Sequence, residues 1–136
     1  MRVLVDTGPL VAILVTRERH HAWAVACLNE FEPPLLTCEA VISEACYLVR
    51  QLSGGRDAVL SLLTRGVVKI GFSLATEIES VRKLKQRYSS VPMSLADACL
   101  VRMAESSSQS QIFTLDGDFR IYRRGRRQAL PLISPL

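Results

Sequence analysis

Four acidic residues of this sequence lie inside or directly after apolar segments. Asp6 and Asp116 each follow a short apolar run that has the composition of a buried strand. Glu44 and Asp97 interrupt stretches that are otherwise apolar and helical in pattern. An ionised carboxylate in such surroundings is unfavourable unless it is paired or bound to a metal ion. The four residues are therefore candidates for a single functional site.

Four clustered carboxylates would require a cation. Each pair would repel by roughly 4 kcal/mol at a separation of about 4 Å and an effective dielectric constant of about 20. Oxygen ligands select hard divalent ions, so Mg²⁺ or Mn²⁺ is the expected cofactor. Zinc is not expected, because His20 and His21 are remote in the sequence from the four acids. Such a site is suited to phosphodiester hydrolysis, in which the metal activates water and offsets charge on the phosphate while a free carboxylate accepts the proton.

Three of the four acids also have ordinary structural roles open to them. Asp6 could cap the helix that follows it, Asp97 could close a capping box with Ser94, and Asp116 could lie in a turn. Glu44 has no comparable local role, because no Lys or Arg stands three or four residues away to pair with it. A partner for Glu44 from elsewhere in the fold remains an alternative to a metal ion.

The elements that would position these acids alternate between strand and helix. Short, uniformly apolar strands alternating with helices are typical of an α/β domain whose parallel sheet is covered on both faces. Such sheets bind ligands beyond the carboxyl ends of their strands, where Asp6 and Asp116 would lie. The expected strands span residues 2–6, 35–37, 67–70, 111–115 and 132–133, and the expected helices span residues 9–16, 18–31, 39–52, 56–65, 75–88 and 95–106.

The composition is that of one globular domain. The chain has 136 residues, of which 49% are hydrophobic and 22% charged, so we expect a single domain over residues 1–136. No apolar run is long enough to span a bilayer, and the first residues read as a strand and not as a signal peptide. The four cysteines form no C-x-x-C pair and are expected to be buried and reduced, as in a cytoplasmic protein; they are Cys27, Cys38, Cys46 and Cys99.

Positive charge is concentrated in two runs. The net charge is +4, which favours a polyanionic partner such as RNA only weakly. A run of basic residues begins at Arg82, and a second directly follows the last acidic motif. The alternative is that both runs are solvated surfaces. We expect RNA contacts from Arg120, Arg123 and Arg124, together with their neighbours Arg126 and Arg127.

Four segments of the chain resemble the acidic motifs of PIN-domain nucleases. In order and spacing they are most similar to the VapC-type toxins of prokaryotic toxin–antitoxin pairs, and the similarity extends over essentially the whole chain. The segments are Leu4-Val-Asp6-Thr-Gly-Pro-Leu-Val-Ala12, Ser43-Glu44-Ala, Ser94-Leu-Ala-Asp97-Ala and Thr114-Leu-Asp116-Gly-Asp118-Phe119.

The resemblance implies a three-layer α/β/α sandwich with a central, mostly parallel sheet of four or five strands. It also implies a metal-dependent endoribonuclease that cleaves RNA, forms a homodimer and binds a cognate antitoxin protein through the region of His20 and His21. The four acids would be the catalytic and metal-binding residues, with Asp118 as an additional acid. Thr7 and Thr114 fall where the family often keeps a hydroxyl that supports the site.

Other functions remain open on the sequence alone. A phosphoacceptor domain also groups acids at strand ends, but it needs adjacent acids after the first strand and a Lys after the last; here Asp6 stands alone and no Lys follows Lys85. An RNA-processing nuclease outside a toxin–antitoxin pair, a DNA nuclease with the same acids, and a catalytically silent RNA- or protein-binding module would all keep the fold.

Overall fold

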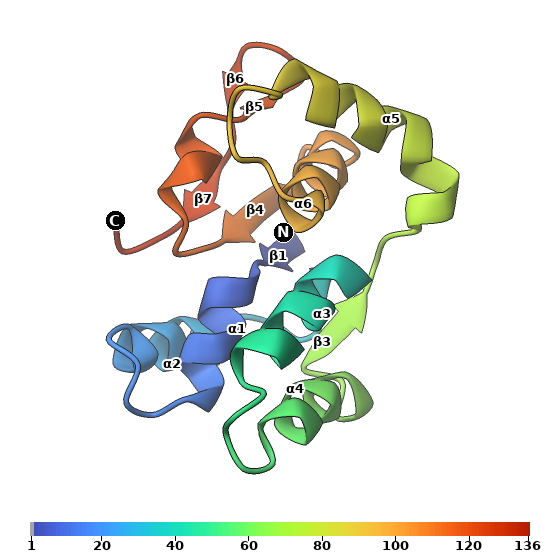
Figure 1. Cartoon of the computed structure of the whole chain (residues 1–136). Helices are drawn as coiled ribbons and strands as arrows, with labels where there is room; N and C mark the ends of the chain where they lie inside the picture. Colours follow the sequence, from blue (N-terminus) through green and yellow to red (C-terminus); the bar gives the residue numbers. More distant parts are fainter. Residues whose placement is uncertain (1) are drawn as a thin grey trace.

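A five-stranded parallel sheet forms the centre of the computed structural model, which describes residues 2–136 (Figure 1). Its strand order is β3-β2-β1-β4-β7, so the first strand lies in the middle, between β2 and β4. The parallel α/β architecture expected from the sequence is confirmed. The strands are β1 (Arg2–Val5), β2 (Leu35–Thr37), β3 (Val68–Ile70), β4 (Ser110–Phe113) and β7 (Leu132–Ile133).

Six helices cover the two faces of this sheet. Figure 1 shows α5 and α6 above it and α1, α2 and α4 below it, while α3 lies beside α1, α4 and α6. The three-layer α/β/α sandwich is therefore confirmed. Among residues 2–136, no helix is long and apolar enough to cross a membrane. The helices are α1 (Thr7–Leu14), α2 (His21–Glu30), α3 (Glu39–Leu48), α4 (Gly55–Thr64), α5 (Leu74–Arg87) and α6 (Leu95–Glu105).

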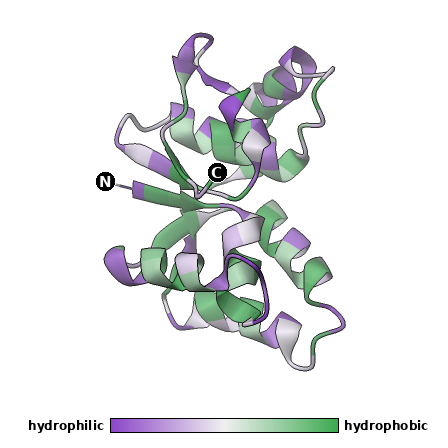
Figure 2. Ribbon diagram, turned by 90° about the vertical axis from the view of Figure 1, so that its left-hand side faces the viewer, coloured by the Kyte–Doolittle hydropathy of each residue, from purple (hydrophilic) through white to green (hydrophobic). Residues whose placement is uncertain are grey.

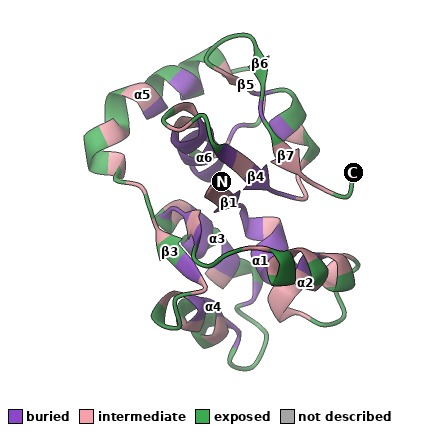
Figure 3. Ribbon diagram, turned by 180° about the vertical axis from the view of Figure 1, so that it is seen from behind, coloured by how far each residue is buried: buried purple, intermediate pink, exposed green. Residues whose placement is uncertain are grey.

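The core is built on the central strands and on α6. Leu4 and Val5 of β1 and Ile112 and Phe113 of β4 are fully buried. Figure 2 shows hydrophobic residues along the strands, and Figure 3 shows that α6 is mostly buried whereas α5 is largely exposed. All four cysteines are free; Cys38 and Cys99 are buried as expected, but Cys27 and Cys46 are only half-buried.

Several helix boundaries differ from the sequence expectation, most of all at the first three helices. The helix α1 begins at Thr7 because the side chain of Asp6 caps it, so Pro9 is the third helical residue, at a position whose N–H has no helical partner in any case. The helix α2 begins at His21, after a turn. The helix α3 ends at Leu48, four residues before the predicted end, because turns occupy the residues that lead to Gly54, whose φ is +70°.

The basic segment after β4 is ordered, which the sequence analysis did not predict. A short 3-10 helix, η1 (Gly117–Arg120), leads into a two-stranded antiparallel hairpin of β5 (Arg123–Arg124) and β6 (Gln128–Ala129). Gly125 takes a φ of +65° in the connecting turn, a conformation that glycine adopts without steric cost. Strands of two residues give no usable period, which is why the hairpin could not be recognised.

Phe113 joins the sheet to the helix layer below it. Its ring packs against Trp23 at 5.3 Å and against Phe31 at 5.2 Å between centroids, so both ends of α2 are attached to the end of β4.

We expect Phe113→Ala to lower the free energy of unfolding by about 3–5 kcal/mol, because it leaves a cavity under fully buried neighbours. Urea denaturation followed by circular dichroism measures this. The exposed Ile78 of α5 provides the control, since Ile78→Ala should change stability by no more than about 0.5 kcal/mol. Equal effects of the two substitutions would show that Phe113 is not part of the core.

Candidate active site

An open cavity of about 510 Å³ lies at the carboxyl edge of the sheet, and all four candidate acids line it. Asp6 comes directly after β1 and Asp116 after β4, while Glu44 comes from α3 and Asp97 from α6. These elements meet at the centre of Figure 1. The lining contains no Lys, Arg or His; its other members are Thr7, Gly8, Leu48, Pro92, Ser94, Leu115 and Gly117.

Asp6 is held by hydrogen bonds to both of its carboxylate oxygens. Its Oδ1 accepts from the backbone N–H of Thr7 at 2.8 Å, and its Oδ2 accepts from the hydroxyl of Thr114 at 2.7 Å. The side chain is 5% exposed. The helix-capping role considered for Asp6 is therefore real, and it coexists with a place in the cavity.

The buried hydroxyl of Thr114 connects two of the acids. Besides donating to Asp6, its Oγ1 accepts from the backbone N–H of Asp116 at 2.9 Å. The start of α1 also approaches the same loop closely, because a Cβ added to Gly8 would lie 3.1 Å from the Cβ of Leu115. Thr114 thus sets the position of Asp116 relative to Asp6.

Glu44 is oriented by Thr7, whose buried side chain donates from Oγ1 to Oε2 of Glu44 at 3.0 Å. Because Thr7 adjoins Asp6, this bond keeps Glu44 beside the rest of the cavity. The expectation that Glu44 is desolvated was wrong: the residue is exposed, and its neighbours Tyr47 and Leu48 are exposed as well. Val41 and Ala45 are buried in the core, but Glu44 lies on the same exposed side of the helix as Tyr47 and Leu48.

The side chain of Asp97 both stabilises the start of α6 and lines the cavity. It closes a capping box with Ser94, in which its backbone N–H donates to Ser94 Oγ at 3.0 Å and its Oδ2 accepts from the Ser94 N–H at 3.3 Å. The same Oδ2 accepts from the hydroxyl of Tyr122 at 2.9 Å. The capping box explains why a charge is tolerated there, and the cavity lining shows that the residue is still accessible from one side.

Tyr122 is the supporting residue that sequence reasoning missed. It is fully buried, and its ring packs edge-on against Tyr88 and Phe119 at 5.2 and 5.3 Å. Burial and the hydrogen bond to Asp97 raise the pKa of its hydroxyl, so it stays a donor. Tyr122 could not be recognised from the sequence, because one tyrosine among arginines belongs to no repeating spacing. The only hint of burial is its apolar neighbour Ile121, which interrupts the basic run.

Burial raises the pKa of both central carboxyls. The pKa of Asp6 rises to about 7, mainly because burial disfavours the charged form, with repulsion from Asp97 and Asp116 adding to the rise and the bonds from Thr114 and Thr7 opposing it. Burial also raises the pKa of Asp97, against the bonds from Tyr122 and Ser94. Both shifts indicate a place where a positive charge would be favourable.

The donor set fits a hard divalent cation. One oxygen each of Glu44, Asp97 and Asp116 accepts a hydrogen bond from the protein, from Thr7, Tyr122 and the Asp118 N–H respectively. Within residues 2–136 no hydrogen bond is found to Glu44 Oε1, Asp97 Oδ1 or Asp116 Oδ2. The three residues line the open cavity, and carboxylate oxygens are the ligands that Mg²⁺ and Mn²⁺ prefer.

The carboxylates line the cavity without closing on one point. In the described part of the chain, no three side chains of His, Cys, Asp or Glu lie close enough together to hold a metal ion. Mutual repulsion and the bonds to hydroxyl groups both hold the carboxylates apart. The expected convergence at the sheet edge is therefore present, whereas the closer spacing of a metal-ligand set is not.

The other sequence-predicted residues lie outside the cavity. Asp118 is half-buried and is not among the lining residues. Its backbone N–H donates to Oδ1 of Asp116. The guanidinium of Arg120 donates to the carbonyl of Leu136, and that of Arg123 donates to the carbonyls of Arg120 and Tyr122 at 2.6 and 3.1 Å. Arg124 lies in β5. None of these three arginines belongs to the lining of the cavity.

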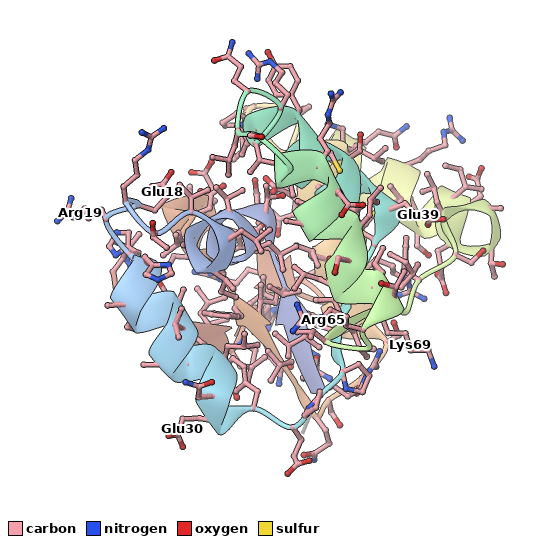
Figure 4. All side chains as sticks on the ribbon, turned by 90° about the horizontal axis from the view of Figure 1, so that it is seen from below. Glu18, Arg19, Glu30, Glu39, Arg65 and Lys69 are labelled. Atoms are coloured by element: carbon pink, nitrogen blue, oxygen red, sulfur yellow. The ribbon has the colours of Figure 1, made fainter. Side chains whose placement is uncertain are left out.

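The histidines are also separate from the acids. His21 makes a 2.7 Å hydrogen bond through Nδ1 with the carbonyl of Ala12, at the junction of α1 and α2. Figure 4 views the molecule from below, where α2 and α4 present labelled charges of both signs, among them Glu30 and Arg65. Neither histidine is among the residues that line the acidic cavity.

Comparisons with known proteins agree with this architecture. The PIN domain profile matches residues 3–125. Ribonuclease VapC26 of Mycobacterium tuberculosis is 29% identical over 116 residues, which cover 84% of this chain and 86% of that protein. The crystal structure of Mycobacterium tuberculosis VapC20, described as a toxin that cleaves the sarcin-ricin loop, matches with a TM-score of 0.75 and 20% identity, covering 95% of this chain and 99% of that one. The structural likeness shows that the two chains share a fold.

The raised pKa of Asp6 makes stability depend on pH. Between about pH 4 and pH 7 this carboxyl is protonated in the folded state and ionised in the unfolded state, so the folded state binds more protons and the free energy of unfolding falls as pH rises. The loss through Asp6 amounts to at most about 4 kcal/mol. We expect Asp6→Asn to reduce this slope and to be more stable than the wild type at pH 8 in EDTA.

Urea denaturation at a series of pH values in EDTA measures this. Asp57→Asn, on the exposed side of α4, is the control and should keep the wild-type slope. An Asp6→Asn variant with an unchanged slope would contradict the raised pKa.

Proposed function

The chain belongs to the PIN domain family, and from that premise we propose that it is a metal-dependent endoribonuclease and the toxin of a toxin–antitoxin pair. The observation that carries the proposal is the cavity at the carboxyl edge of the sheet, lined by four acids and by no basic residue. The names of the two matched proteins support the choice of RNA as substrate, because one is a ribonuclease and the other a toxin that cleaves the sarcin-ricin loop.

We propose that Asp6, Glu44, Asp97 and Asp116 hold Mg²⁺ or Mn²⁺. When bound, the cation would stabilise negative charge on the attacked phosphate and on the leaving oxygen. Glu44, Asp97 and Asp116 each line the cavity with one oxygen that accepts no hydrogen bond from the described residues, whereas both oxygens of Asp6 are hydrogen-bonded. Asp118, outside the lining, is the least favoured of the acids for this role.

The protein groups have separate tasks in this proposal. Thr7 donates to one oxygen of Glu44, which orients the carboxylate and leaves its other oxygen available to the cation. Thr114 and Tyr122 donate to the carboxylates of Asp6 and Asp97, which keeps those groups oriented while no substrate is present. The apolar side chains of Leu48, Pro92 and Leu115 border the cavity and limit the access of water.

The partners are proposed on the same basis. A toxin of this family would act in the cytoplasm, as a homodimer, and would be inhibited by an antitoxin protein bound near His20 and His21. We propose that the chain is a single nuclease domain. An RNA-processing nuclease outside a toxin–antitoxin pair is the second candidate, since the site would serve it equally.

The cation and the acids should be required together. We expect Asp97→Asn to abolish RNA cleavage while keeping the fold, because Asn preserves the capping oxygen. We also expect Mn²⁺ to raise the melting temperature of the wild type by several degrees and that of Asp97→Asn by much less. Asp57→Asn should behave as wild type in both assays.

Two results would contradict this assignment. Full cleavage in excess EDTA would show that the reaction needs no metal ion, and full cleavage by Asp97→Asn would show that it does not need the Asp97 carboxylate. The thermal shift does not depend on knowing the RNA target, so it tests cation binding separately from activity.

The hairpin arginines are proposed to contact the RNA backbone. We expect replacement of Arg123 and Arg124 by Ala to weaken binding of single-stranded RNA about equally across sequences, because phosphate contacts carry no sequence information. The slope of log K against log salt should become shallower by about 0.7 for each lost contact. The matched control replaces two exposed arginines of the α4 region, Arg56 and Arg65, by Ala. An equal loss of RNA affinity in this control would show that the hairpin arginines act only through the net charge of the protein.

A further inference from the structure

The exposed side of α3 continues the acidic cavity with an aromatic surface. Glu44, Tyr47 and Leu48 lie three and four residues apart, so they share one face of the helix. Tyr47 is 62% exposed and Leu48 is 58% exposed. Glu44 and Leu48 line both the acidic cavity and a second, largely apolar hollow of about 380 Å³ that also includes Ser43 and Tyr47. We call this surface, with Arg50 beside it, the Tyr47 face.

Arg50 completes the Tyr47 face. Its guanidinium carbon lies 3.8 Å from the centroid of the Tyr47 ring, within the range of a cation–π contact. The same guanidinium donates from one NH group to the carbonyl of Tyr47 at 2.8 Å. These two contacts fix a planar cation against a planar ring. Among the ion pairs of residues 2–136, none involves Arg50, so its charge is not neutralised by a carboxylate.

This arrangement is unlike the other exposed hydrophobic residues of the protein. Leu60, Ile78 and Ile121 are exposed singly on separate elements, which is normal for a protein surface. The Tyr47 face instead places two large side chains together, next to the acids, and adds an unneutralised arginine. An aromatic ring with a stacked guanidinium is the kind of surface on which unpaired bases of single-stranded RNA stack.

We propose that Tyr47 and Arg50 form the binding site for a nucleobase adjacent to the scissile phosphate of single-stranded RNA. The proposal rests on the function proposed above and names where its substrate is held. Glu44 and Tyr47 are one helical turn apart, so a phosphate at the acids and a base on the ring belong to neighbouring parts of one strand. Arg50 also supplies positive charge where the acidic cavity itself repels phosphate.

The first test separates binding from chemistry by steady-state cleavage of a short single-stranded RNA. We expect Tyr47→Ala to raise KM by about 5- to 150-fold, the range for loss of one stacked base, with little change in kcat. Tyr47→Phe should stay near the wild-type KM, because the ring is retained. Leu60→Ala, which removes an exposed leucine from α4, should change neither constant. Cleavage by Tyr47→Ala with wild-type KM would overturn the proposal while leaving the proposed nuclease function intact.

The second test locates the stacked base. RNAs carrying 2-aminopurine at each position in turn are bound to the wild type and to Tyr47→Ala in EDTA, and the fluorescence of the probe is recorded. Quenching at one position beside the cleavage site, lost in Tyr47→Ala and kept in Tyr47→Phe, is the expected result. Equal quenching in both proteins would overturn it.

A second copy of the chain is the competing occupant of the Tyr47 face. Light scattering of wild type and Tyr47→Ala at the same concentrations distinguishes the two. An unchanged mass with a raised KM supports a base-binding site. A mass halved by Tyr47→Ala, with KM restored when the protein is concentrated enough to reassociate, would assign the face to contact between copies and overturn the proposal.

Discussion

Burial of carboxylates that the fold brings together at one edge of the sheet is the constraint on which the rest of this structure depends. Asp6 and Asp97 are 5% and 6% exposed, and burial raises the pKa of each. A site of this kind cannot be held by the acids themselves. It is held by neutral hydroxyl donors from three different segments, each of which donates to a carboxylate without adding charge; they are Thr7, Thr114 and Tyr122.

The hydroxyl groups explain how the sheet and the helices are kept in register around the site. Thr7 connects α1 to Glu44 of α3, Thr114 connects the end of β4 to Asp6, and Tyr122 connects the hairpin segment to Asp97 of α6. At the same edge the hydroxyl of Thr37 donates to the carbonyl of Val5 at 2.8 Å, which ties the ends of β2 and β1. Neutral donors suit this task because they orient a carboxylate without neutralising its charge.

The parts of the fold that follow from local pattern could be predicted, and those that depend on tertiary contacts could not. The strand that contains Leu4 could be predicted from its run of apolar residues. The helix that contains Asp97 could be predicted from its apolar residues and from the capping residue Ser94. The exposure of Glu44 could not be predicted, because an apolar neighbourhood in sequence does not say whether its residues face the core or solvent. Tyr122 and the pair of Tyr47 with Arg50 were missed for a related reason: one aromatic residue in a polar or helical segment has no spacing that distinguishes a role.

The hydrogen bond between Thr114 and Asp6 spans 108 positions of the chain, and this has a consequence for the order in which the protein is made. β1 is synthesised early, but its neighbour β4 and the donors Thr114 and Tyr122 leave the ribosome much later. Until then the middle strand of the sheet lacks one partner, and Asp6 lacks the donor that orients it. Contacts of such sequence separation also form slowly. The four acids can therefore reach the arrangement seen here only after residue 122 has emerged from the ribosome.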